Sequence, residues 1–340
     1  MKIKAIDIAE ELGISKATVS LALNNKPGVS ETTRQQVLEC RKKLESRQAA
    51  AAASDSDLAG SVIKLVVFNC HNQMGDVINL RILSENTIDR IAKEWGAIAE
   101  VLYYDPSVDD PTTLLNYCAS SRVRGIVVGG YEVEKNSRFI EEQLLALGKP
   151  TVIYDCNLSD NISCVIYNNS GAVHMCTERL AAAGHPDIIY FSRSITIYNY
   201  ASRRIAFRDI VRDPESGITG RIVPLGTLVE EIEQNAIAYF TKHGVPDAML
   251  LESYHVTIGV VKALRTLNIS VPEETSFIGI DEVPDYMVGG LNFTHVTVPH
   301  VEKAVRAMDV LKYEITRSMD TKVKVYLNCK LVEGDTVKQC

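Results

Sequence analysis

The sequence predicts two unlike parts, a small all-α head at the N-terminus and a larger α/β part with doubly wound parallel sheets. Two short helical patterns meet at a glycine within the first 25 residues, and from Ser61 onward apolar strands alternate with amphipathic helices. With 340 residues, of which 46% are hydrophobic, the chain is long enough for the head and one or two α/β domains.

The head begins with two helices that pack against each other. Gly13 permits a sharp turn between them because glycine accepts a positive φ at little cost, and Ser15 is a suitable N-cap for the second helix. A third helix begins after Ser30 and closes a small core. The inward positions are predicted to be Ile6, Ala9, Leu12, Val19, Ala22, Leu23, Val37, Leu38 and Leu44.

The outward face of the second helix carries small, hydroxylated, basic and apolar side chains. Such side chains can approach base edges and phosphates without a clash or like-charge repulsion. They are Lys16, Ala17, Thr18, Ser20 and Leu21. This face is typical of a recognition helix that enters a DNA groove; a three-helix packing module without DNA is the alternative.

The charge distribution favours DNA binding by the head alone. Residues 1–50 hold nine Lys and Arg against six Asp and Glu, a net charge of +3; the whole chain carries −7, so the rest carries −10. An acidic body repels phosphates and a basic head attracts them. Because so small a head makes few contacts, we expect a homodimer that places two heads on two half-sites of double-stranded operator DNA.

Between the two parts lies an unbroken alanine run, Ala49–Ala53, followed by alternating serine and aspartate. Alanine is the best helix former, yet so short a helix is marginal alone. The segment is therefore either a helix that forms only with the support of DNA or a partner chain, or a passive tether.

The α/β part contains more strands than one small sheet holds, so we expect two similar lobes with a cleft between them. The strands are expected at 62–68, 98–104, 125–128, 150–154, 188–191, 221–224, 248–251 and 276–280, and helices at 84–95, 111–120 and 173–183. Asp110 before Pro111 indicates a helix start. Ligands of such folds bind beyond the carboxyl ends of the strands.

Several classes of protein are not expected. No apolar run reaches the length of a membrane span and the N-terminus lacks the apolar core of a signal peptide, which indicates a cytoplasmic protein without a membrane partner. The eight cysteines form no Cys-x-x-Cys pair, so reduced thiols are favoured over a metal site or disulfides. Without a phosphate loop or a His-Glu-x-x-His motif, neither an enzyme nor a cofactor is expected, and His185 is expected to cap a helix end.

The head closely resembles that of the LacI/GalR family of bacterial repressors. The matching motifs are Gly13-Ile14-Ser15, Thr18-Val19-Ser20, Leu23-Asn24, Val29-Ser30 and Thr33-Arg34. The α/β part is similar to the sensor of that family, whose fold is shared with periplasmic sugar-binding proteins. Segments that follow the family's order are 148–155, 168–171, 180–185, 246–248, 271–273, 279–281 and 294–296.

The resemblance implies three regions. They are a helix-turn-helix DNA-binding domain at 1–48, a hinge at 49–61, and an effector-binding and dimerisation domain at 62–340. Within the last, the N-lobe is expected at about 62–164 plus 295–322, and the C-lobe at about 165–294 plus 323–340.

In the head, the resemblance implies that Lys16 and Ala17 read bases and that Leu21 faces the groove. The positions that match phosphate contacts are Thr18, Ser20, Asn25 and Ser30. Leu21 departs from the family's usual arginine, which removes one guanine contact. Lys16 as an ordinary solvated lysine and Leu21 as a packing residue are the alternatives.

The hinge departs further from the family. Its members usually carry a leucine that wedges into the minor groove and kinks the operator. Here the alanine run replaces the usual hinge motif, and Leu58 is the only wedge nearby. We hypothesise a hinge helix that packs across the dimer and bends DNA less.

In the sensor, the resemblance places Asp155, Arg203 and Asp281 around the cleft. Two carboxylates and a guanidinium suit a polyhydroxylated ligand, because each group can take two hydroxyls. The structural alternatives are a strand-end carboxylate for Asp155, an ion pair for Arg203, with Arg204 as its rival, and a helix cap for Asp281.

Other cleft positions differ from the family. Ser253-Tyr254 stands where the family commonly has Asn-Asp. Tyr167 and Tyr254 could stack on a sugar ring or only line the lobe. The family's usual Asn-Pro-Phe-Phe motif near the first strand is also absent, and Cys70-His71-Asn72-Gln73 stands nearby. The resemblance therefore implies a sugar or sugar derivative, but these differences prevent naming it.

These features together predict an allosteric transcriptional repressor whose small polar effector binds between the lobes. Lobe closure would change the spacing or order of the two heads, a coupling typically worth about 1–3 kcal/mol. The effector's identity, its action as inducer or corepressor, and the operator sequence stay open. The alternative is a DNA-binding regulator without ligand response. Tetrameric members of the family carry a C-terminal leucine heptad. Residues 323–340 contain none, so a dimer is expected.

Overall fold

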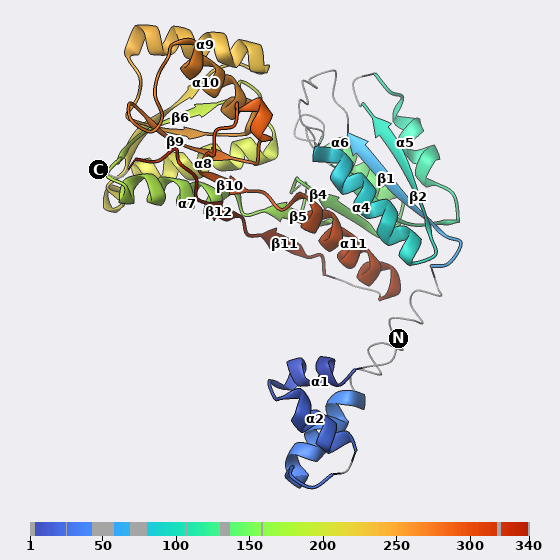
Figure 1. Ribbon diagram of the computed structural model, residues 1–340. Helices are drawn as coiled ribbons and strands as arrows, with labels where there is room; N and C mark the ends of the chain where they lie inside the picture. Colours follow the sequence, from blue (N-terminus) through green and yellow to red (C-terminus); the bar gives the residue numbers. More distant parts are fainter. Residues whose placement is uncertain are drawn as a thin grey trace. The chain divides into compact units, whose positions relative to one another are not determined.

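The computed structural model in Figure 1 describes residues 4–24, 26–42, 58–68, 80–105, 108–129, 137–157, 159–317 and 321–338. The chain divides into two compact units, Met1–Ser61 with Glu94–Ala97, and Val62–Lys93 with Ile98–Cys340. The head belongs to the first unit, and both sheets belong to the second.

The head contains α1 (Ala5–Leu12), α2 (Lys16–Leu23) and a third helical segment at 31–42. Gly13 ends α1 with a φ of 64°, and the Oγ of Ser15 accepts the N–H of Thr18 at 3.1 Å. The Oγ of Ser30 accepts the N–H of Thr33 in the same way, also at 3.1 Å. Both predicted serine caps and the glycine turn are confirmed.

The core of the head differs from the expected stripe at two positions. Ile6 is 45% exposed and Ile8 is buried in its place, because the inward face of α1 follows residues 5, 8, 9 and 12. On the third helix Leu38 is exposed, whereas Val37 is buried. The expected core residue Leu44 lies outside the described residues.

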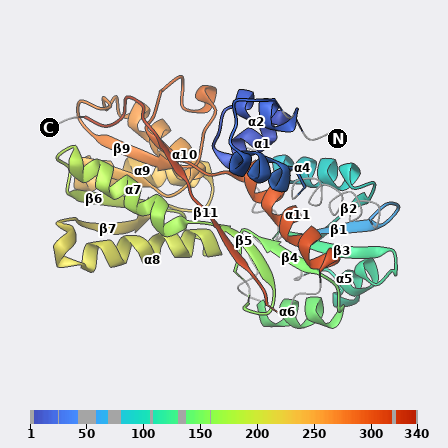
Figure 2. The same ribbon diagram turned by 90° about the horizontal axis from the view of Figure 1, so that it is seen from below.

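Two six-stranded sheets form the α/β part (Figures 1 and 2). The first has the order β11-β5-β4-β3-β1-β2 and the second β12-β10-β9-β8-β6-β7. The first sheet comprises β1 (Val62–Phe68), β2 (Ile98–Tyr104), β3 (Val123–Gly129), β4 (Thr151–Tyr154), β5 (Ser163–Tyr167) and β11 (Lys324–Leu327). The second comprises β6 (Asp187–Ser192), β7 (Thr219–Pro224), β8 (Ala248–Leu251), β9 (Ser276–Ile280), β10 (His295–Thr297) and β12 (Lys330–Val332). Described neighbours pair in parallel except β10 and β12, so the predicted doubly wound, two-lobed fold is confirmed.

Helices cover both faces of each sheet (Figure 2). Those of the first lobe are α4 (Leu80–Glu94), α5 (Pro111–Cys118), α6 (Ser137–Ala146) and α11 (His300–Thr316). Those of the second are α7 (Asn169–Ala182), α8 (Tyr198–Arg212), α9 (Val229–His243) and α10 (Tyr254–Thr266), with short 3-10 turns at Pro214–Ser216 and Asp285–Met287. Asp110 caps α5 as predicted, since its carboxylate accepts the N–H of Thr112 at 2.8 Å.

Strand pairing differs from the expected lobe limits near the crossings. Residues 163–167 and 324–327 pair with each other in the first sheet, and 295–297 pair with β9 in the second. The expectation had placed 295–297 in the N-lobe and 324–327 in the C-lobe. Strands as short as β10 and β12 carry no recognisable periodic pattern, so the sequence did not indicate which sheet they join.

Several further expectations concern single residues. The backbone N–H of His185 donates to the carbonyl of Leu180 at 3.0 Å and so caps the end of α7 as expected. Its side chain has other partners: Nδ1 lies 2.6 Å from Asp247 Oδ2, and Nε2 lies 3.1 Å from the carbonyl of Lys338. Leu58 is fully buried in a turn, where its carbonyl accepts the N–H and hydroxyl of Ser61. The six described cysteines are buried free thiols. Among the described helices none is both long and apolar enough to span a membrane.

Candidate functional site

The face of the head that is expected to recognise DNA lies on α2. Lys16, Ala17 and Ser20 are exposed, and Leu21 is half-buried on the same side of the helix. The hydroxyl of Thr18 lies 2.8 Å from that of Ser15, within the N-terminal cap. A small basic and apolar face of this kind can enter a major groove without steric hindrance.

The two other predicted DNA contacts lie elsewhere. Ser30 is exposed at the start of the third helix, where its side chain also caps that helix. Asn25 lies outside the described residues. The sequence pattern assigned Arg34 no role beyond its place in a family motif. In the structure its guanidinium donates to the carbonyls of Ala22 and Lys26 at 3.3 and 3.2 Å and so stabilises the end of α2.

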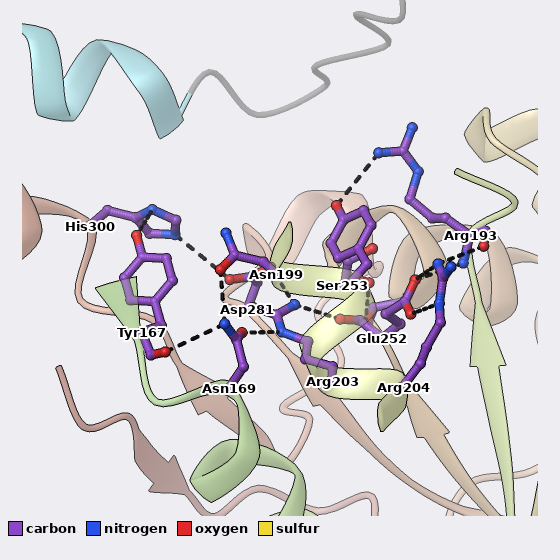
Figure 3. Close-up of polar contacts among 12 residues, drawn as sticks. Tyr167, Asn169, Arg193, Asn199, Arg203, Arg204, Glu252, Ser253, Asp281 and His300 are labelled. Carbon is purple, nitrogen blue, oxygen red and sulfur yellow. Dashed lines mark hydrogen bonds and ion pairs between the residues drawn. The ribbon is translucent and has the colours of Figure 1, made fainter. Parts of the chain in front are cut away.

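The sensor residues gather where the strands end. Asp155 follows β4, Tyr167 ends β5, Ser253 follows β8 by two residues and Asp281 follows β9. Parallel strands bring these ends to one edge of each sheet, which is where ligands of doubly wound folds bind. Figure 3 shows the resulting cluster of polar side chains around Arg203.

Arg203 lies on α8 and is held in place by neutral and charged partners (Figure 3). Its Nε donates to Asn169 Oδ1 at 2.9 Å and one terminal nitrogen donates to the carbonyl of Glu252 at 2.7 Å. The same terminal nitrogen lies 3.7 Å from Asp281 Oδ2. The side chain of Asn169 is fixed in turn by Asn199 at 2.8 Å. The guanidinium is therefore preorganised beside a carboxylate.

Asp281 is buried and adopts the left-handed region with a φ of 85°. Burial alone would raise the pKa of its carboxyl, but Arg203 and His300 outweigh this and lower it. The carboxylate Oδ1 lies 3.7 Å from His300 Nε2, and neither atom has a hydrogen-bond partner. Two buried polar atoms thus face each other without a hydrogen bond between them.

His300 begins α11 and connects the strand ends of both lobes. Its Nδ1 lies 3.0 Å from the hydroxyl of Tyr167 at the end of β5, and its Nε2 faces Asp281 beyond β9. The structure thus brings Tyr167, Arg203 and Asp281 together through a histidine that the sequence reasoning missed. A polar residue after the short strand β10 was the only signal for it.

Asp155 has a partner that was not expected. Lys303 on α11 places its Nζ 2.6 Å from Asp155 Oδ2, and both side chains are about 2% exposed. The ammonium also lies 4.8 and 5.2 Å from the ring centroids of Tyr154 and Tyr167. The Oδ1 of Asp155 has no hydrogen-bond partner. The lysine was missed because it lies 148 residues away in the sequence.

The carboxylate of Glu252 pairs with Arg204 and leaves the neighbouring Arg203 to face Asp281. Glu252 is fully buried, and its two carboxylate oxygens accept from Nε and a terminal nitrogen of Arg204 at 2.6 and 2.8 Å. Burial raises the pKa of Glu252, opposed by Arg204. Because Arg204 is paired in this way, Arg203 alone of the two faces Asp281. Glu252 was not identified from the sequence, although its position directly after the apolar strand β8 could have indicated a residue of the site.

The remaining two predicted residues have different surroundings. Ser253 is fully buried, and its Oγ has no hydrogen-bond partner. Tyr254 stacks on His255 with ring centroids 3.9 Å apart and belongs to a hydrophobic cluster under α9 and α10. Ser253 thus lies beside the Arg203 network, whereas Tyr254 packs in the core. The described residues contain no group of His, Cys, Asp and Glu suited to a metal ion.

A helix-turn-helix head joined to a two-lobed α/β sensor defines the class of DNA-binding transcriptional regulators. Residues 4–45 match the bacterial regulatory proteins of the lacI family, and residues 177–337 match the periplasmic binding protein-like domain. The chain therefore combines a lacI-family DNA-binding domain with a periplasmic binding protein-like domain, and its relatives are regulators of transcription.

Three known proteins illustrate the similarity. The ribose operon repressor of Halalkalibacterium halodurans is 21% identical over 324 residues, which cover 91% of this chain and 93% of that protein. A solved complex of the transcriptional regulator CelR with cellobiose has a TM-score of 0.68 at 19% identity, with 97% of this chain and 98% of that chain covered. The lac repressor dimer bound to operator and the anti-inducer ONPF has a TM-score of 0.65 at 19% identity, covering 99% and 100%. The two structures share the fold of this chain.

Proposed function

We propose that this protein is a homodimeric, operator-binding repressor whose DNA affinity is set by a sugar or sugar derivative bound between the lobes. The observation that carries the effector site is a set of buried polar atoms without hydrogen-bond partners. They are Asp155 Oδ1, Ser253 Oγ, Asp281 Oδ1 and His300 Nε2. Buried polar atoms are normally satisfied, so their concentration at the strand ends favours a hydroxyl-rich ligand that completes them.

The chemistry of these groups suits a carbohydrate. Asp281 and Asp155 offer acceptors, Arg203 offers donors beside Asp281, and Tyr167 offers a ring next to His300. The names of the similar proteins, with ribose and cellobiose among them, agree with this ligand class. We infer that the effector holds His300 against Asp281 by bridging both, which couples lobe closure to the heads.

The homodimer is supported by an exposed apolar face on the first lobe. Ile82 and Leu83 of α4 and Val101 and Tyr103 of the edge strand β2 are each more than 40% exposed. Tyr103 donates its hydroxyl to Glu85 on α4 at 2.7 Å, which keeps the helix and strand side by side. A second copy that covers this face would bury it and double the number of DNA heads.

In the head, we propose base contacts by Lys16, Ala17 and Leu21, and phosphate contacts by Thr18, Ser20 and Ser30. The domain limits proposed are 1–48 for the head, 49–61 for the hinge and 62–340 for the sensor. As operator DNA is the partner, we place the protein in the cytoplasm.

The effector site is tested by thermal unfolding of the full-length protein with a panel of sugars and sugar phosphates. A true effector raises the melting temperature of the wild type, and Asp281→Asn removes this shift because the negative charge is lost and an NH2 donor replaces one of the two acceptor oxygens. Glu282→Gln is the matched control, since Glu282 is an exposed neighbour. A regulator without ligand response is the second candidate, favoured by the internal pairing of Asp155 with Lys303. No stabilisation by any member of the panel would select it.

A further inference from the structure

Arg193 is a buried cation that the proposed sugar contacts do not use. It follows β6 and is 5% exposed. Its Nε and one terminal nitrogen donate to the carbonyl of Thr227 at 3.0 and 2.7 Å, and the other terminal nitrogen lies 3.5 Å from the hydroxyl of Tyr200. Within the described ranges no carboxylate forms an ion pair with its guanidinium. A buried charge balanced only by neutral groups is costly.

The neighbouring charges are already paired. Glu252 binds Arg204 through both oxygens, and Asp281 lies beside Arg203. Glu252 Oε2 also accepts the backbone N–H of Arg193 at 2.9 Å, which is a contact of the main chain. Glu231, the next carboxylate, is exposed and accepts the N–H groups of Thr227 and Leu228. The N–H groups of Thr227 and Leu228 lower the pKa of Glu231, and the charge of Arg193 adds to this effect through space. Among the described residues, the guanidinium of Arg193 therefore has no carboxylate in direct contact.

Two helix N-termini reach the same edge without side-chain caps. The N-cap residues are Ile197 for α8 and Ser253 for α10, and neither makes a side-chain cap hydrogen bond. Ser253 is fully buried, yet its hydroxyl has no partner at all. The first N–H groups of a helix and its dipole attract anions. The unpartnered hydroxyl and the buried guanidinium are independent signs of a missing acceptor.

We propose that this end of the site binds an anionic group, a carboxylate or a phosphate, carried by the effector. Arg193 supplies the charge, Ser253 and Tyr200 supply hydroxyls, and the N-termini of α8 and α10 supply N–H groups. Arg193 and His300 lie at opposite ends of the cluster in Figure 3, so an acidic sugar would place its charge at one end and its hydroxyls at the other. The inference rests on the proposed effector site and narrows its ligand class.

The first experiment needs no knowledge of the effector. Thermal unfolding of the full-length protein is followed with inorganic phosphate and with sulfate, against chloride at constant ionic strength. The wild type is expected to gain stability from both oxyanions. Arg193→Gln should bind phosphate at least tenfold more weakly, because a charge-assisted contact is lost. Arg193→Lys keeps the charge and should retain part of the response, and Arg208→Gln, on the exposed side of α8, should match the wild type.

The second experiment uses matched ligands: glucose, glucose 6-phosphate and glucuronate, and ribose with ribose 5-phosphate. The inference predicts that an anionic member binds the wild type at least tenfold more tightly than its neutral partner, and that Arg193→Gln removes this preference. A phosphate preference or a carboxylate preference identifies the group.

The outcomes separate the two proposals. If neither oxyanion stabilises the wild type, or if Arg193→Gln responds like the wild type, the anionic subsite is overturned. Neutral sugars that bind equally to both proteins would still uphold the sugar effector. Oxyanion binding that depends on Arg193, with no response to any sugar, would instead uphold the subsite and reject the sugar.

Discussion

Replacement of Lys303 by methionine tests the charge balance of the first lobe. The substitution keeps the length of the side chain and removes the ammonium that lies 2.6 Å from Asp155 Oδ2. The Oδ1 of Asp155 already has no partner, and the side chain is 2% exposed. The variant therefore leaves a buried carboxylate with no counter-charge.

The expected cost is about 3–5 kcal/mol, the range for removal of one partner of a buried ion pair. This is large against the about 5–15 kcal/mol that stabilises a typical domain. The double variant Lys303→Met with Asp155→Asn removes both charges, and Asn tolerates the φ of 66° that Asp155 adopts. It should be more stable than Lys303→Met alone, because the unpaired charge has gone.

Unfolding in urea, followed by the fluorescence of Trp95, measures both variants. Trp95 is the only tryptophan and is buried. Arg306→Met on the same helix is the control, since its ion pairs with Glu302 and Asp309 are on the surface and worth about 0–1 kcal/mol. The ion pair does not stabilise the lobe if the free energy of unfolding of Lys303→Met stays within about 1 kcal/mol of the wild type, or if the double variant loses the sum of the two single losses.

Three further predictions follow from other contacts. Arg34→Ala should destabilise the head by about 1–2 kcal/mol, because the carbonyls of Ala22 and Lys26 lose their donor; limited proteolysis of the full chain should cleave the head faster, and an unchanged rate contradicts the brace. Leu58→Ala should cost about 2–5 kcal/mol in urea unfolding, because its side chain is fully buried; a large loss of operator bending at unchanged stability would instead make Leu58 a wedge. Because the pKa of Asp281 is lowered in the folded protein, its carboxylate stabilises the fold at pH values above the ordinary pKa of 3.8, and this stabilisation is lost as the pH falls through the folded pKa. The difference in melting temperature between wild type and Asp281→Asn should therefore shrink below pH 3.8. A difference that stays constant down to about pH 2 would contradict this.

The sequence predicts several strands well because most of their residues are apolar. The bounds of β1, β2, β8 and β9 agree with the expected ranges. Local signals of one or two residues also sufficed for the caps at Ser15 and Asp110, since a cap depends only on neighbouring N–H groups.

The missed features all depend on distant parts of the chain. β10 and β12 have three residues each, too few for a recognisable period. The pair of Asp155 and Lys303 and the contact of Tyr167 with His300 join residues more than 130 positions apart. Glu252 was missed because a charge after an apolar strand reads as a surface residue, whereas Arg204 draws it into the interior.

The carboxylates and the guanidinium of the sensor were expected from resemblance, and the structure adds their geometry. Arg203 and Asp281 lie together, but Asp155 is engaged by Lys303. Ser253 stands where the family commonly has asparagine, and the structure places it at the start of α10, where its side chain makes no cap hydrogen bond. The site therefore combines groups that are already paired with a few that are not.

Ligand binding in the sensor is expected to change the DNA affinity of the head. The most direct test selects bound DNA from a random duplex pool and then measures affinity for the selected site with and without the sugar or acidic sugar that stabilises the protein. We expect an inverted repeat and an affinity change of about 5–150-fold, which is absent in Asp281→Asn. An inducer lowers the affinity and a corepressor raises it. Retention of DNA without sequence preference, or a selected site whose affinity does not change with any stabilising ligand, would show that the sensor does not control the head.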